Sequence, residues 1–93
     1  MCTYVTERTE VSGSAKGARG WFALSHATVY FDHPFHTPME HTLNIDFVDE
    51  PAGPSARVAV ELSATSARAL VHCIEAALAA AGPAAGDNEP VHK

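Results

Sequence analysis

The stretch FDHPFHTPMEH, residues 31–41, gathers side chains that could bind a metal ion. Imidazole and carboxylate groups are ligands for transition metals, and this stretch supplies His33, His36, Glu40 and His41. Their spacing, His-x2-His-x3-Glu-His, differs from defined zinc motifs such as HExxH. We expect a site for a divalent transition metal here, with Zn, Fe, Ni and Cu as candidates, and we keep a polar surface turn as the alternative.

Two prolines, at positions 34 and 38, stiffen this stretch. A residue that precedes proline is pushed into extended conformations, which limits the shapes that the stretch can adopt. If a hairpin closes at His33 and His41, their Cβ atoms lie about 5 Å apart, so both imidazoles can reach one ion. His36 and Glu40 would then fold over that ion.

The segments on either side of this stretch alternate apolar and polar residues, which is typical of half-buried antiparallel strands. A hairpin that pairs His33 with His41 gathers the alternating apolar residues on one face, whereas a slip of one residue would bury Asn44 and Asp46. The apolar residues concerned are Ala27, Val29, Phe31, Leu43, Ile45 and Phe47. In this register Asp32 lies opposite Thr42, Tyr30 opposite Asn44, and Thr28 opposite Asp46. The opposite, polar face carries His26, Thr28, Tyr30, Asp32, Thr42, Asn44 and Asp46, and the later strand is expected to add Arg57 and Glu61.

Three uses are open to that polar face: it could be solvated, form the floor of a site for a small polar molecule, or meet a second copy in a homodimer. Tyr30 and Asp32 are the candidates for proton transfer. The candidates for ligand binding are His26, Asn44 and Asp46. Asp32 and His26 could also support the metal ligands from a second layer. Cys2, one residue from the chain start, is either a soft ligand, a nucleophile or an inert thiol.

The remaining elements follow from periodicity and from turn residues. We expect strands at residues 3–11, 21–33, 41–48 and 56–62, a flexible connection at 12–20, a hairpin connection at 34–40, and a turn at 49–55. A helix should begin after Ser63 and end at Gly82. The chain is therefore expected to be an α+β protein: a four-stranded antiparallel sheet with one C-terminal helix packed on one face. Residues 1–82 form the single domain, and 83–93 a disordered tail.

Composition excludes several classes of function. The 93 residues allow one domain, and the net charge of −5 with no basic patch argues against binding to nucleic acid. No apolar run is long enough to span a membrane, and the start of the sequence lacks the features of a signal peptide, so we expect a cytoplasmic protein. Two cysteines are too few for a disulfide framework.

Several segments resemble a family of small actinobacterial proteins of unknown function. The resemblance rests on MCTYVTE, VSGSAKG, HATVYFDHP through EHTLNIDF, and PSARVAVEL, and it extends to the end of the predicted helix. The resemblance implies a domain that folds by itself. It brings no established activity.

The sequence thus predicts a small homodimeric metal-binding protein with a His/Glu site at a hairpin tip. An ion with an open coordination position could activate water or oxygen, in which case the protein would be a metalloenzyme. The alternative is a metal-free module that uses its polar sheet face to bind a small ligand or to assemble with its own copies.

Overall fold

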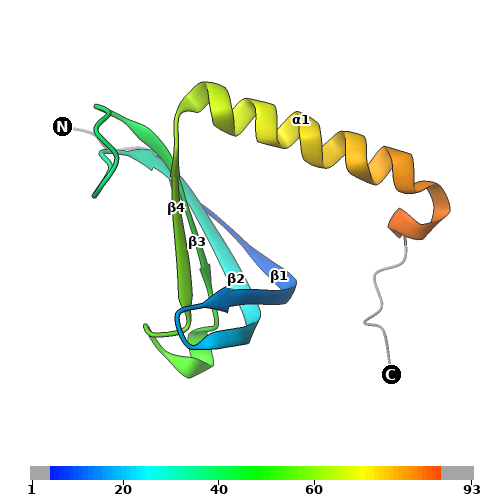
Figure 1. Ribbon diagram of the computed structural model, residues 1–93, viewed down its shortest axis with the longest axis horizontal. Coiled ribbons are helices and arrows are strands. Elements are labelled where there is room, and N and C mark those ends of the chain that lie inside the picture. The colour runs from blue at the N-terminus through cyan, green and yellow to red at the C-terminus, as the bar shows by residue number, and fades with distance from the viewer. Residues whose placement is uncertain (1–4, 87–93) are drawn as a thin grey trace.

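The computed structural model describes residues 5–86 as an antiparallel sheet followed by a helix (Figure 1). The predicted α+β class is confirmed. The strands lie side by side in chain order. They are β1 (Glu7–Gly17), β2 (Gly20–Asp32), β3 (Thr42–Val48) and β4 (Arg57–Leu62). The helices are α1 (Ala64–Ala81) and two short 3-10 helices, η1 (Glu50–Ala52) and η2 (Gly82–Gly86).

The first hairpin is longer than the sequence predicts. Residues 12–17, expected to be a flexible connection, continue β1 and pair with β2 up to Gly17 opposite Gly20. The register shifts between Glu10 and Gly13, and this bulge keeps the pairing intact on both sides. Pairing with Trp21 and its neighbours thus overrides the weak strand preference of the Gly/Ser-rich segment. Of the predicted strand at 3–11, residues 3 and 4 lie outside the described residues.

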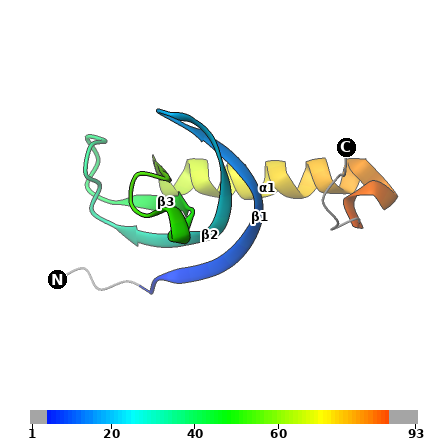
Figure 2. The ribbon, with the colours of Figure 1, turned by 90° about the horizontal axis from the view of Figure 1, so that it is seen from below.

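The pairing of β2 with β3 has the predicted register. Asp32 lies opposite Thr42, Tyr30 opposite Asn44, and Thr28 opposite Asp46. β4 extends the polar face, because Asn44 faces Glu61 and Asp46 faces Ala59. The β1–β2 hairpin curls strongly (Figure 2), and β1 contacts β4 although β2 and β3 lie between them in the sheet order.

The ends of α1 are those that the sequence predicts. The Ser63 hydroxyl accepts a hydrogen bond from the Ser66 backbone N–H at 3.1 Å, which caps the first turn. At the other end Gly82 adopts a φ of 62°, a left-handed conformation that favours glycine. Residues 83–86, expected to belong to a disordered tail, complete η2, and 87–93 lie outside the described residues.

The helix covers less of the sheet than expected. α1 stands out from the sheet (Figure 1), and residues in its first three turns form a groove with β2, β3 and β4. Among residues 5–86 the only buried apolar side chains are those of Ala27 and Ala56. The strand residues that face the helix, such as Val29 and Ile45, are only half-buried. No helix in this part of the chain is long and apolar enough to cross a membrane.

Candidate functional site

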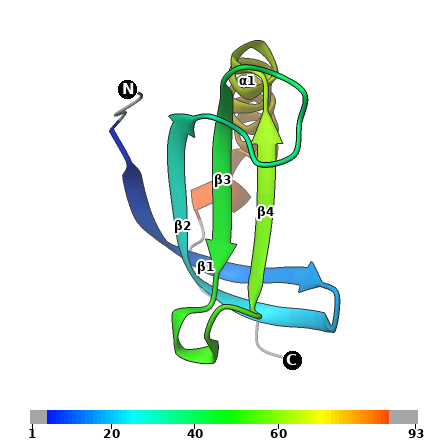
Figure 3. The ribbon, with the colours of Figure 1, turned by 90° about the vertical axis from the view of Figure 1, so that its left-hand side faces the viewer.

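The loop between β2 and β3 folds over the polar face of the sheet. Figure 3 shows this loop, residues 33–41, reaching across β3 to β4. Glu61 of β4 holds it there: its carboxylate accepts backbone N–H bonds from Phe35 at 2.6 Å, from His36 at 3.2 Å and from Thr37 at 2.9 Å. Three consecutive loop amides therefore converge on one side chain.

These bonds assign Glu61 a structural role. The N–H groups of Thr37 and Phe35, followed by that of His36, hold the pKa of Glu61 below its ordinary value of 4.5. The carboxylate is therefore ionised at neutral pH, and both of its oxygens already accept hydrogen bonds. Glu61 is suited to anchoring the loop and poorly suited to proton transfer.

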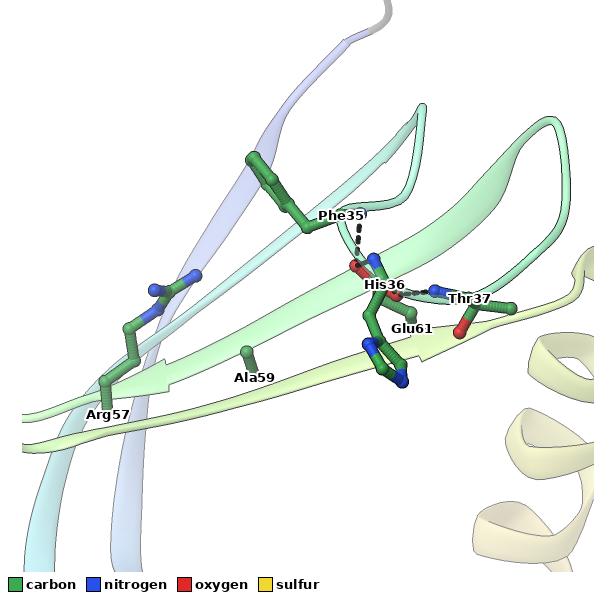
Figure 4. A pocket seen from close by; sticks show the side chains of 6 residues that line it. All are labelled: Phe35, His36, Thr37, Arg57, Ala59 and Glu61. Atoms are coloured by element: carbon green, nitrogen blue, oxygen red, sulfur yellow. Dashed lines mark hydrogen bonds between the residues drawn. The ribbon is translucent and has the colours of Figure 1, made fainter.

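A pocket of about 500 Å³ opens between the anchored loop and β4 (Figure 4). We call it the loop pocket; it is lined by Phe35, His36, Thr37, Arg57, Ala59 and Glu61. Ala59 leaves room on the strand between Arg57 and Glu61, because its side chain is a single methyl group. The ring of Phe35 is 87% exposed, so it is an apolar surface without cover at the edge of the pocket.

Arg57 is fixed by its neighbour on β3. Its Nε and Nη2 donate to one oxygen of Asp46, at 3.1 and 2.7 Å. A guanidinium carries five N–H donors, so this pair leaves further donors on a side chain that is about half exposed. Arg57 therefore brings hydrogen-bond donors to the pocket, and Asp46 holds them in position.

The centre of the polar face carries Tyr30 and Asn44. Burial raises the pKa of the Tyr30 hydroxyl, and the negative charge of Asp46 raises it further, so Tyr30 is neutral and poorly suited to act as a base. Asn44 is buried, and its Oδ1 accepts from the Thr42 hydroxyl at 2.6 Å. Its Nδ2 has no hydrogen-bond partner within residues 5–86.

The four predicted metal ligands are not gathered in one place. The rings of His33 and His41 stack with centroids 4.7 Å apart, so their predicted proximity is confirmed. Glu40 contributes its backbone carbonyl, which accepts a bond from His33 Nδ1 at 3.0 Å. His36 instead lines the loop pocket. In the described part of the chain, no three His, Cys, Asp or Glu side chains are arranged to hold a metal ion.

The other candidates are spread along the sheet. His26 lies midway along β2, opposite Val48 at the end of β3, and its Nδ1 is 3.0 Å from Ser25 Oγ and 3.3 Å from a carboxylate oxygen of Glu50. It is therefore too far along the strand to support ligands in the loop. Asp32 accepts a bond from the His33 backbone N–H at 2.7 Å, which fixes the start of the loop. Cys2 lies outside the described residues.

Sequence reasoning had placed Arg57 and Glu61 on the polar face but gave neither a role. It also missed Phe35, Thr37 and Ala59. One signal was present: the expected connection of seven residues, 34–40, is longer than most hairpin loops.

The chain belongs to a family of unknown function (DUF6295), whose model matches residues 1–87. This match confirms that the chain belongs to a family of unknown function, as the resemblance implies. Comparison with curated proteins and with solved structures gives no match.

Proposed function

Because membership of this family brings no activity with it, we propose from the geometry that the protein binds a small polar molecule in the loop pocket. One observation carries the proposal. Glu61 holds the loop over Ala59, and a pocket of about 500 Å³ remains between Phe35 and Arg57. A volume of this size is typical of small-molecule sites. A turn that merely connected two strands would not need an anchor on a third.

The lining groups indicate the chemistry of the ligand. Arg57 supplies donors, so the ligand should carry a hydrogen-bond acceptor such as a carbonyl. The exposed ring of Phe35 favours a flat apolar part that can stack against it. Three carboxylates on this face, those of Asp32, Asp46 and Glu61, outnumber the one guanidinium and disfavour an anion. The ligand class is therefore a small, uncharged planar molecule with an acceptor group.

Three probes that share a ring and differ in charge test this proposal: benzamide, benzoate and benzylamine. Each is titrated into 15N-labelled protein while amide shifts are followed by NMR. We expect benzamide to shift the amides of residues 35–37 and 57–61, with a dissociation constant in about the millimolar range for so small a probe. The two charged probes should bind more weakly, because the carboxylates repel benzoate and the ammonium group of benzylamine offers Arg57 no hydrogen-bond acceptor.

Two loop variants complete the test. Phe35→Ala should remove most of the benzamide response, whereas Met39→Ala, an exposed apolar residue of the same loop that does not line the pocket, should leave it unchanged. Benzamide shifts that are absent, or that survive Phe35→Ala in full, would contradict the proposal.

A second candidate function is binding of a divalent transition metal, and the observation that favours it is the close pair of imidazoles from His33 and His41. Turning both rings towards one ion would give a two-histidine site for Zn, Fe, Ni or Cu. Metal binding should weaken in acid, because protonated imidazole cannot ligate.

The test is a Zn²⁺ titration by calorimetry on untagged protein. His41→Ala should abolish binding, and His36→Ala, which removes a histidine of the same loop that lies in the loop pocket, should not. Circular dichroism confirms that both variants are folded. Loss of Zn²⁺ binding in both variants would instead support the larger site predicted from the sequence. If the wild type gives no heat of binding, the hypothesis of metal binding is wrong.

A further inference from the structure

Helix α1 carries an apolar stripe that nothing in residues 5–86 covers fully. The stripe includes Leu70, Val71, Ile74 and Leu78, which recur at the spacing of one helical face. These four side chains are between 42% and 54% exposed. A soluble domain normally buries such a stripe against its own core, so this stripe requires another partner.

The stripe borders a groove that the sheet lines from the other side. Val29, Leu43 and Ile45 of the sheet face Leu70 and Ile74 of the helix across about 290 Å³. Among the described residues that line this groove, Arg68 alone carries a charge. Figure 1 shows why the groove stays open: α1 leaves the sheet instead of lying along it.

We propose that a second copy of this chain fills the groove, with the two α1 helices packed antiparallel about a two-fold axis. The four stripe side chains stay between 42% and 54% exposed in one copy, and the matching stripe of a second copy would cover them.

A second copy fits better than a different protein. With only Ala27 and Ala56 buried among its described apolar residues, one chain has too small a core to be stable alone. The partner that covers the stripe must therefore be present whenever the chain is folded. A second copy of the same chain meets this condition. An isologous pair also needs one surface that complements itself, and here each helix would lie in the groove of the other chain.

Two charged residues set the orientation of the helices. Arg68 and Glu75 lie seven positions apart and so occupy the same edge of the stripe. In an antiparallel pair this edge meets its own counterpart, which places Arg68 of each copy beside Glu75 of the other. In a parallel pair it would meet the opposite edge, where Ser66 and Cys73 offer no charge.

Sedimentation equilibrium tests the dimer at micromolar concentration. The wild type should have twice the mass of one chain. Leu78→Glu places a charge in the stripe and should weaken association at least about a hundredfold, giving either a folded monomer or a chain without helical circular dichroism. Ala76→Glu is the matched control, because it adds the same charge on the opposite side of α1 and should remain dimeric.

A folded wild-type monomer, or a Leu78→Glu protein that still dimerises like the wild type, would overturn the proposal. So would a loss of dimer in Ala76→Glu equal to that in Leu78→Glu.

Charge exchange then tests the orientation by fluorescence-detected sedimentation at lower concentration. Glu75→Arg should weaken the dimer roughly tenfold, since two ion pairs become repulsive, and Arg68→Glu combined with Glu75→Arg should restore it. Failure of the double variant to recover would contradict the antiparallel pair.

Discussion

At the scale of single residues, Glu61 decides where the loop lies. Glu61→Gln keeps the shape of the side chain but removes the charge and one acceptor oxygen, so the amides of Phe35, His36 and Thr37 should exchange with solvent faster. The exchange of these three amides, measured by NMR, checks this. Glu40→Gln, at an exposed carboxylate of the same loop, should leave their exchange unchanged. Equal rates in both variants would show that the anchor does not hold the loop.

The same contact predicts how the loop responds to pH. The folded-state pKa of Glu61 lies below 4.5, so its contribution to loop order is present above that value and is lost as the pH falls through the lowered folded pKa. The loop amides of the wild type should therefore lose protection from hydrogen exchange as the pH falls below 4.5 and Glu61 becomes protonated. The loop amides of Glu61→Gln should not change over the same pH interval. Protection that stays constant in the wild type through this range would contradict the assignment.

At the scale of elements, the start of α1 depends on one cap. Ser63→Ala removes the hydroxyl that accepts the Ser66 N–H, and it should cost about 1 kcal/mol of stability in chemical denaturation. Ser66→Ala is the matched control, because Ser66 contributes its backbone N–H to this bond and its side chain is exposed. Its effect should be within about 0.5 kcal/mol of zero. Similar losses in both variants would show that the cap contributes little.

The elements also show which features the sequence could predict. Alternation of apolar and polar residues and the Ser63 and Gly82 signals are local, so the β2–β3 register and the ends of α1 followed from them. The strand character of residues 12–17 did not, because it comes from pairing with β2. The position of the loop could not be predicted from local sequence either, because Glu61 lies more than twenty residues further along the chain. The metal hypothesis assumed that four neighbouring ligands point together, and the anchoring draws His36 away.

At the scale of the whole molecule, a dimer makes stability depend on concentration. Dilution by a factor of about 100 removes roughly 2.7 kcal/mol from the folded dimer, which should lower the melting temperature by about 5–10 °C. Differential scanning fluorimetry or circular dichroism over that range checks this. Ala76→Glu should show the same dependence, and Leu78→Glu should show either none or no transition. A wild-type melting temperature that does not vary with concentration would indicate a monomer.

The end of β4 has a consequence for how the two faces communicate. Glu61 clamps the loop on one face, Leu62 forms a wall of the groove on the other, and Ser63 caps α1, and these three residues are consecutive. A shift of the backbone there moves all three contacts together. Opening of this strand end should therefore release the loop and the helix as one cooperative unit. A single short segment, residues 61–63, thus connects the contacts on the two faces of the sheet.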